Sequence, residues 1–296
     1  MGRKKLNLTE AKIEKMLLSG RGRGKGDGYQ SWLKNGDFSS KGRSSRIKST
    51  KFNRIHHTFS DLETDFLYTL LWDDSIVDIR EQYSLLPVSE TEEIANILGI
   101  RYPKPPKYRK DEEEKYVHVM TTDFLVTKIE DGVEFYIAYC VKLENDLLKS
   151  RALQKIAIEE AYWNKRNVKF KIITENSFSR KKAKNIKRIV NKVTLPLDEF
   201  ITSEEFYTIS SKLKESIIEF YDKNVMLNDI CKQIDINFNL DSGQTLHSFF
   251  YLAGIKDIPI LLDSRLIGSK MINEIIDIET LKIEYSRRSN QNELNA

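Results

Sequence analysis

Cysteine is scarce in this sequence, with two residues, Cys140 and Cys231, among 296. Two distant cysteines exclude a disulfide-stapled miniprotein and a cysteine-rich zinc site, and they predict a reducing compartment such as the cytoplasm. Long hydrophobic runs are also missing, because the longest unbroken apolar stretch is the seven residues from Phe135 to Val141. A membrane-spanning helix needs about 20 apolar residues. We therefore expect a soluble cytoplasmic protein that has no membrane partner.

The charge of the chain is unevenly distributed. Residues 1–58 hold 15 Lys/Arg and 4 Asp/Glu, whereas the rest of the chain holds 33 Lys/Arg and 40 Asp/Glu. A basic arm on a mildly acidic body is typical of proteins that bind a polyanion, although a solvated tail can have the same charge. Hydrophobic residues make up 40% of the chain, which is a globular composition, and the length favours two domains.

The basic arm contains a glycine-rich stretch, residues 20–28, in which five of nine residues are glycine. Glycine allows a backbone to approach phosphates closely, and cations neutralise them. The stretch has neither the Gly-Lys-Ser/Thr ending of a Walker loop nor a preceding strand. A flexible linker looks similar. The hypothesis is that a phosphate chain is held by five cations of the arm, namely Arg21, Arg23, Lys25, Arg43 and Arg46.

The first two-thirds of the chain predict a mixed α/β domain. Asp131-Gly132 predicts a hairpin turn between two strands rich in aromatic and β-branched residues. Residues 100–115 are rich in proline and charge, which predicts a loop. The expected helices are 8–18 (capped by Thr9), 60–72 (capped by Ser60) and 146–165, and the expected strands are 76–86, 116–127, 134–143 and 168–174.

Residues 178–193 carry seven Lys/Arg and no acid, and we place a domain boundary here, giving domains 1–178 and 179–296. Beyond it the pattern is mainly helical, and three helices followed by a strand fit a winged-helix-like module. The expected elements are helices 203–221, 226–234 and 242–253, with Gly254 as the last C-cap, and a strand at 258–262.

Three residues of the α/β domain have the chemistry of metal-dependent phosphodiester hydrolysis. Asp123 lies near the start of one strand of the hairpin, Lys142 ends the next, and Glu63 lies in the first turn of the preceding helix. Two carboxylates can hold Mg²⁺ and leave positions for water and phosphate. The lysine can stabilise the charge that develops on the phosphoryl group.

Each of these residues also has a structural interpretation. Glu63 can complete a capping box with Ser60. Asp123 can be a surface residue at a strand end, although the apolar residues after it favour burial and pairing. Lys142 can be a solvated strand end. The pattern alone therefore leaves a nuclease, a phosphotransferase and a purely structural domain open.

Several longer motifs narrow this choice, and with them the chain resembles the TnsA family, the restriction-endonuclease-like subunits of heteromeric bacterial cut-and-paste transposases. The resemblance runs from about Lys12 to the C-terminus and is densest before Glu175. The motifs are GRGRGKGDGYQSWL (20–33), GRSSRI and HHTFSDLE (within 42–63), DIREQYSLLP (78–87), MTTDFLV (120–126) and EAYW (160–163).

The resemblance implies a nuclease domain of the PD-(D/E)xK type followed by a winged-helix-like domain. It implies that Glu63, Asp123 and Lys142 are catalytic, and that the Val141 carbonyl is a further metal ligand. It also implies transposon-end DNA as the substrate, cut at the 5′ ends in bacterial cytoplasm. The implied partners are a TnsB-like integrase-type transposase subunit and a TnsC-like AAA+ ATPase regulator docked on the C-terminal domain. Independently of the resemblance, we expect Glu159, on the following helix, to be a supporting acid.

The sequence departs from the family pattern at Cys140, which stands where the (D/E)xK motif requires an acid or an amide. A neutral thiol is a poor Mg²⁺ ligand, so Cys140 is a doubtful second metal position, and Mn²⁺ could substitute better there. Glu63 can supply the lost carboxylate. The leading interpretation is a Mg²⁺-dependent DNA endonuclease subunit, and the alternative is a non-catalytic DNA-binding assembly subunit whose nuclease site has decayed. An independent restriction enzyme is disfavoured by the family-like arm and C-terminal domain.

Overall fold

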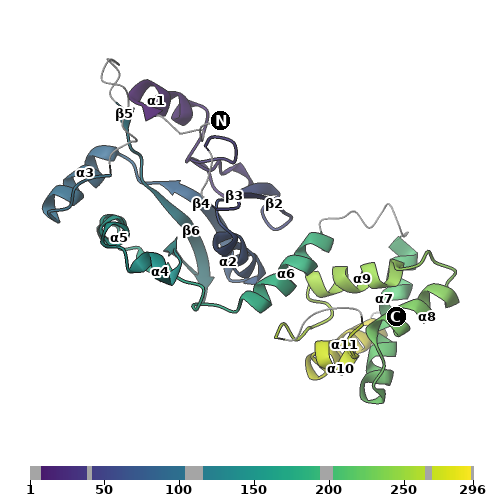
Figure 1. The fold of residues 1–296 in the computed structure, drawn as a ribbon. Helices are drawn as coiled ribbons and strands as arrows, with labels where there is room; N and C mark the ends of the chain where they lie inside the picture. The colour runs from purple at the N-terminus through teal and green to yellow at the C-terminus, as the bar shows by residue number, and fades with distance from the viewer. Residues whose placement is uncertain (1–7, 39–41, 104–115, 194–202, 264–268, 295–296) are drawn as a thin grey trace, which may run out of the picture. The chain divides into compact units, whose positions relative to one another are not determined.

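The computed structural model describes residues 8–38, 42–103, 116–193, 203–263 and 269–294. The chain divides into two compact units, residues 1–180 and residues 181–296 (Figure 1). The first unit is built on a mixed sheet, and the second consists mainly of helices. Among the described residues, no helix combines the length and the apolar character that crossing a membrane requires.

The central sheet of the first unit has four strands in the order β4 (Ile76–Ser84), β6 (Thr121–Glu130), β7 (Val133–Val141) and β8 (Lys169–Ile173). The first two pairings are antiparallel and the last is parallel. Asp131 and Gly132 join β6 to β7, and both have left-handed backbone angles (φ of 51° and 78°). Two left-handed residues form the tight turn whose twist suits a hairpin. This turn sets the register in which Phe124 pairs with Tyr139.

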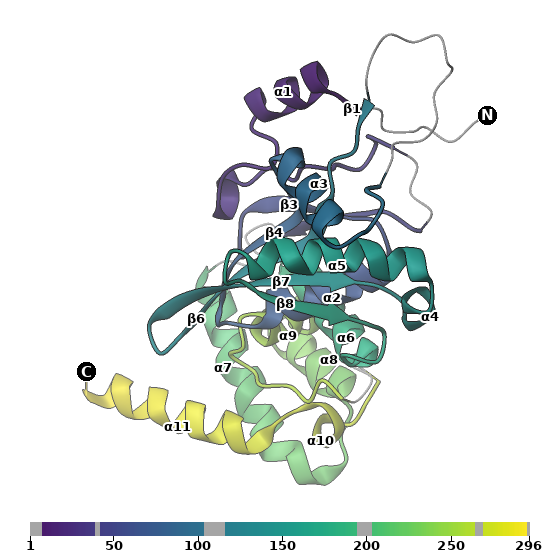
Figure 2. The ribbon, with the colours of Figure 1, turned by 90° about the vertical axis from the view of Figure 1, so that its left-hand side faces the viewer.

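Helices cover both faces of this sheet (Figures 1 and 2). On one face, Phe66 of α2 (Asp61–Trp72) contacts the rings of Phe124 and Tyr139. On the other face lies α5 (Ser150–Asn164), whose Ile158 packs in one cluster with Leu125. The alternation of Phe124 and Leu125 follows from the two-residue period of a strand, and both side chains are buried because both faces are covered.

Smaller elements surround the sheet, and α3 (Val88–Ile97) packs beside α5. Trp32 is fully buried in a cluster with Leu8, Met16 and Val119. The described part of the N-terminal arm is therefore a folded layer of the domain and contributes to its core. The remaining elements of this unit are β1 (Leu8–Thr9), α1 (Glu10–Leu18), η1 (Gly26–Gly28), β2 (Ser45–Ser49), β3 (Arg54–Thr58), β5 (Tyr116–Val117) and α4 (Glu144–Leu147).

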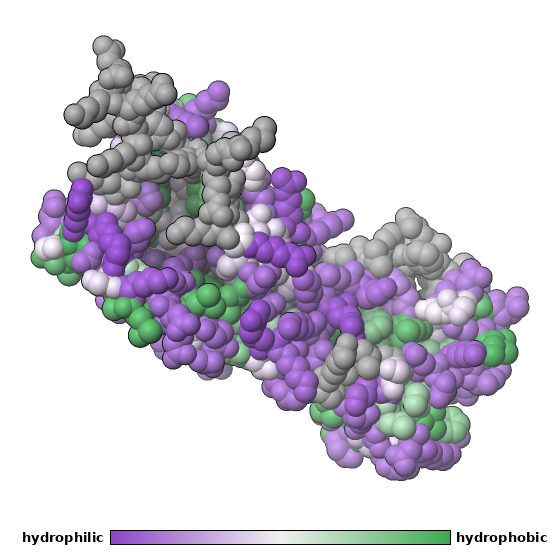
Figure 3. Space-filling view, in the orientation of Figure 1, coloured by the Kyte–Doolittle hydropathy of each residue, from purple (hydrophilic) through white to green (hydrophobic). Residues whose placement is uncertain are grey.

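The second unit packs its helices around a core that includes the fully buried Leu213, Ile217 and Phe249. Its elements are α6 (Arg180–Val193, whose first residue ends the first unit), α7 (Ser203–Phe220), η2 (Tyr221–Lys223), α8 (Leu227–Asn237), α9 (Gln244–Gly254), α10 (Ile272–Ile275) and α11 (Ile278–Leu294). The surface seen in Figure 3 is largely hydrophilic, with apolar side chains in small separate patches.

Several sequence expectations are wrong in detail. The strand expected at 258–262 is absent: within that described range, Ile260 alone forms a bridge, with Ile276. The winged-helix assignment stays a prediction. Gly254 is the last residue of α9 and Ile255 is the cap, so the glycine serves close packing: a Cβ there would lie 2.0 Å from a methyl of Val193.

Two expected elements are divided in the structure. The helix expected at 146–165 is α4 and α5, and the strand expected at 116–127 is β5 and the start of β6. Helix α3 was not expected. The helix expected from residue 8 begins at Glu10, and Thr9 caps it as predicted by accepting the Lys12 N–H at 3.3 Å. Most of the expected loop at 100–115 lies outside the described residues.

Candidate active site

Asp123 and Lys142 are brought together at the ends of neighbouring strands. The Lys142 ammonium donates to Asp123 Oδ2 and to the Val141 carbonyl oxygen, both at 2.9 Å. The Val141 N–H also donates to Asp123 Oδ2, at 2.6 Å. Asp123 is buried and Lys142 is half-buried. Burial lowers the pKa of Lys142, but the nearby charges, first of all that of Asp123, outweigh it and raise this pKa. Lys142 is therefore a cation at neutral pH.

Glu63 joins this pair from the first turn of α2. Its backbone N–H donates to the Ser60 hydroxyl at 3.1 Å, and its carboxylate accepts from the Phe59 N–H at 2.9 Å and from the Ser60 hydroxyl at 3.0 Å. The structural interpretation of Glu63 is thus partly correct, because this side chain does help to hold the helix start. Burial, and then the negative charge of Asp123, raise the pKa of Glu63 to about 7. The Glu63 carboxylate therefore accepts hydrogen bonds at the start of α2 and is also close enough to Asp123 for that charge to raise its pKa.

Cys140 and Glu159 interact with each other beside the Asp123–Lys142 pair. Cys140 is buried, and burial followed by the Glu159 charge raises the pKa of its thiol well above the ordinary value. Burial, and then the charge of Asp123, raise the pKa of Glu159 to about 8. One carboxyl oxygen of Glu159, Oε1, is buried and has no hydrogen-bond partner within the described parts of the chain. Cys140 thus faces a carboxyl group and is a neutral thiol, which makes it a poor ligand for a hard cation.

Sequence reasoning did not find Gln82, which contacts Glu63. Gln82 Nε2 donates to Glu63 Oε2 at 3.3 Å, and Gln82 Oε1 accepts from the Thr121 hydroxyl at 3.4 Å. Its backbone is left-handed (φ 50°), which is unfavourable for a residue other than glycine and is often retained at functional sites. The sequence did contain a signal for this residue, because residues 78–82 place four polar side chains in an expected strand. The structure shows that all four are buried.

The side chains at the site suit a cation that prefers oxygen. Among the described residues, no three His, Cys, Asp or Glu side chains are grouped to hold a metal ion. The remaining donor set is Glu63, Asp123 and the Val141 carbonyl, which suits Mg²⁺ because this ion keeps several waters and uses one or two carboxylates. Burial and the charge of Asp123 raise the pKa of both Glu63 and Glu159, and one Glu159 oxygen has no hydrogen-bond partner within the described residues. A cation at this position would stabilise the ionised form of these carboxyl groups. The residues therefore fit a divalent cation.

The expected DNA-binding cations are held in different ways. Arg21 contacts Asp37 at 2.5 Å and also donates to the Trp32 carbonyl oxygen, so its charge is largely used within the domain. Lys25 is exposed and donates to the Tyr136 hydroxyl at 3.3 Å. The remaining three cations are exposed, namely Arg23, Arg43 and Arg46. Arg46 donates to the Asn35 carbonyl oxygen at 3.2 Å.

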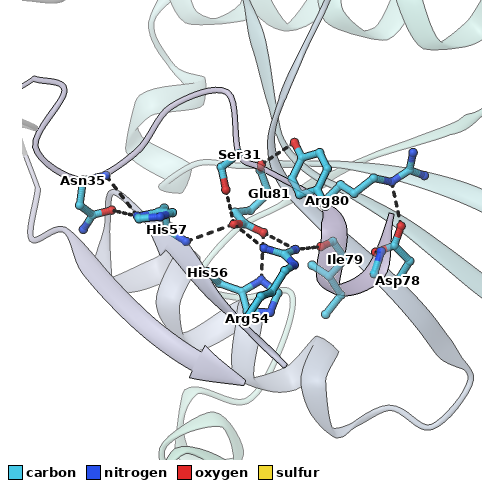
Figure 4. A network of polar contacts seen from close by, with 11 residues as sticks. Ser31, Asn35, Arg54, His56, His57, Asp78, Ile79, Arg80 and Glu81 are labelled. Atoms are coloured by element: carbon cyan, nitrogen blue, oxygen red, sulfur yellow. Dashed lines mark hydrogen bonds and ion pairs between the residues drawn. The ribbon is translucent and has the colours of Figure 1, made fainter. Parts of the chain in front are cut away.

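A second buried acid, Glu81 of β4, organises the layer that carries these cations (Figure 4). Glu81 accepts from both terminal nitrogens of Arg54, at 2.9 and 2.8 Å, and lies 2.9 Å from His56 Nδ1. The Ser31 hydroxyl and the His57 N–H also donate to it. Burial raises the pKa of Glu81, but His56 and Arg54 outweigh burial and lower this pKa far below its usual range. One carboxylate thus fixes the β2–β3 hairpin and the arm to the sheet.

An α/β domain that presents carboxylates and a lysine at one end of its sheet has the features of an endonuclease domain. A family model described as "TnsA-like endonuclease N terminal" matches residues 73–175, which include Asp123, Lys142 and Glu159. The chain is also 35% identical over 246 residues to the transposon Tn7 transposition protein TnsA of Escherichia coli, covering 83% of this chain and 84% of that protein. The chain belongs to the TnsA family.

Proposed function

We propose that this protein is the Mg²⁺-dependent DNA endonuclease subunit of a heteromeric transposase, and that it cleaves the 5′ ends of a transposon. The observation that carries the proposal is the contact of Lys142 with Asp123 and the Val141 carbonyl oxygen, beside a Glu63 whose pKa is raised. Family membership supports the endonuclease class.

In the proposed reaction Glu63, Asp123 and the Val141 carbonyl would hold the cation. When bound, Mg²⁺ supplies Lewis-acid polarisation of the phosphoryl oxygen and a lower pKa for its bound water. Lys142 is protonated and already lies 2.9 Å from Asp123, so it can donate to a phosphoryl oxygen as negative charge develops. The same protonation prevents Lys142 from acting as the base. Gln82 and Ser60 hold the Glu63 carboxylate in place. Mn²⁺ can replace Mg²⁺ at such a site.

The arm supplies phosphate contacts beside the cut. Lys25 contacts Tyr136, which lies four positions before Cys140 on β7. The contact places Lys25 against the strand that ends at Val141. Arg23, Arg43 and Arg46 extend this surface, and Arg21 contributes to its fold. The C-terminal domain is proposed to dock a TnsC-like AAA+ regulator, and the 3′ ends are left to a TnsB-like partner.

The alternative, a DNA-binding assembly subunit without catalysis, depends on Cys140. This residue is neutral and buried against Glu159, so it removes one possible ligand. It does not disturb the Asp123–Lys142 contact or the Glu63 turn. The geometry therefore favours catalysis.

The test is a nicking assay on transposon-end DNA with the partner transposase subunit, with Mg²⁺ and in EDTA. We expect nicks at the 5′ ends that require both Mg²⁺ and this protein. DNA binding and complex assembly with no Mg²⁺-dependent nick would favour the non-catalytic alternative.

A further inference from the structure

Helix α6 (Arg180–Val193) carries seven Lys/Arg and no acid, whereas residues 194–296 hold 10 Lys/Arg and 17 Asp/Glu. The contrast is sharp within one unit, because α7 mixes both signs and Lys212 pairs there with Glu215. Like charges three or four positions apart destabilise a helix, and a helix that is only solvated usually mixes charges. Within the unit, Lys182 contacts Asp263 at 3.1 Å, so part of this charge is paired internally. A run of like charges on the remaining exposed side is typical of a surface that meets a polyanion.

The orientation of α6 is fixed by its apolar side. Ala183, Ile186 and Ile189 are buried in the second unit, and the Asn185 amide donates to the Leu262 carbonyl oxygen at 2.8 Å. The opposite side is exposed and runs along one face, since its residues are three, four or seven positions apart. It consists of Lys181, Lys184, Lys187 and Arg188. Figure 3 shows a hydrophilic surface over this helix.

The start of α6 is tied to the helix that carries Glu63. Arg180 Nε contacts Asp65 Oδ2 at 2.8 Å, and Phe178 packs on the ring of Phe66 at 5.5 Å. Asp65 lies two positions after Glu63 in α2. The first cation of the exposed face, Lys181, follows Arg180 directly in the chain. The basic face therefore begins directly after a residue that is anchored to α2.

We propose that the exposed basic face of α6 binds the phosphate backbone of duplex DNA, without reading its sequence, as a contact region in addition to the arm. This inference extends the proposed nuclease function by assigning a further DNA-binding surface. Duplex DNA is favoured over an acidic protein because it carries one negative charge per about 1.7 Å, a density that matches several cations over about 10 Å of helix. The rest of the unit remains available for a protein partner.

The test measures binding of the full chain to a fluorescent duplex of unrelated sequence, in EDTA, over a series of salt concentrations. The variant Lys181→Gln/Lys184→Gln/Lys187→Gln removes three exposed charges. We expect the slope of log affinity against log salt to become shallower by about 2.7, since each phosphate contact contributes about 0.9. The matched control is Lys212→Gln/Lys223→Gln/Lys232→Gln, which removes the same charge from other exposed positions of the unit and should leave the slope unchanged.

Replacement of the same three α6 lysines by arginine should retain the wild-type slope. An α6 glutamine variant whose slope equals that of the control would overturn the proposal. So would loss of partner capture by that variant with unchanged DNA binding, because this result would assign the face to an acidic protein. The measurement needs neither metal nor cleavage, so failure of the proposed nuclease function would be seen separately.

Discussion

Two groups of buried acids in the first unit differ in how completely they are neutralised. Glu81 meets Arg54, His56, a hydroxyl and a backbone N–H, and its pKa is lowered. Glu63 and Glu159 share one lysine with Asp123, and their pKa values are raised to about 7 and about 8. Both groups are buried, so burial alone does not distinguish them. The difference lies in the number of donors and cations that meet each carboxylate.

This comparison distinguishes Glu81, which joins parts of the fold, from the acids of the proposed active site. A carboxylate whose two oxygens both accept hydrogen bonds from neighbouring donors and cations stabilises the fold. It keeps no acceptor position open for a ligand. Carboxylates that crowd together with too few cations cost stability, and such crowding is typical of sites that receive a cation or a proton.

The largest expected effect is on cleavage. Asp123→Ala removes the carboxylate that contacts both Lys142 and the Val141 N–H, so 5′ cleavage should fall by at least about a thousandfold because a cation ligand is lost. Folding, followed by circular dichroism, should be retained. The control Glu130→Ala changes an exposed acid at the other end of β6 and should cleave normally. Normal cleavage by folded Asp123→Ala would refute the assignment.

The second prediction concerns stability. Glu81→Gln leaves Arg54 and His56 buried without their carboxylate, and removing one partner of a buried ion pair costs about 3–5 kcal/mol. Glu63→Gln should cost far less at pH 7, because the carboxyl group it replaces is about half protonated there. Urea unfolding of the two isosteric variants measures the difference. Equal losses of stability would show that the two groups of acids are not distinct.

The third prediction is the pH dependence of the metal-free protein. Because folding raises the pKa of Glu63 and Glu159 from 4.5 to about 7 and about 8, the folded state holds protons that the unfolded chain has released. These two groups therefore make stability fall as the pH rises from about 4.5 to about 8. Glu81 acts in the opposite sense, since its lowered pKa gives stability that is lost in acid.

The urea midpoint measured in EDTA from pH 5 to pH 9 tests this sign. Glu63→Gln should flatten part of the fall, and saturating Mg²⁺ should oppose it. A midpoint that rises over this range, unchanged by Glu63→Gln, would contradict the raised pKa values.

The smallest effect is expected at Cys140. Cys140→Gln restores an amide oxygen without adding charge, yet we expect the half-saturating Mg²⁺ concentration for cleavage to change by less than tenfold, about 1.4 kcal/mol. The reason is that Glu63 and Asp123 already provide two carboxylates. Cys140→Ser is the matched small variant, because a larger side chain at a buried position can strain the packing. A decrease of tenfold or more in Cys140→Gln alone would show that the missing ligand matters.

The sequence was sufficient where local rules decide the outcome. The Asp131-Gly132 turn and the two-residue strand period bring Asp123 and Lys142 to one end of the sheet. The Ser60 cap fixes the start of α2 and hence the position of Glu63 in it. Turn type and helix caps depend on a few neighbouring residues, so they can be read from the chain.

The tertiary structure alone decided which charges are neutralised. It brought Gln82 to Glu63, set Glu159 behind Cys140 and paired Arg21 with Asp37. It also made the described glycine-rich arm part of the core and matched Glu81 with Arg54 and His56. These contacts join segments far apart in the chain. Burial and the distances between charges set the pKa values, and both depend on packing that no local pattern specifies.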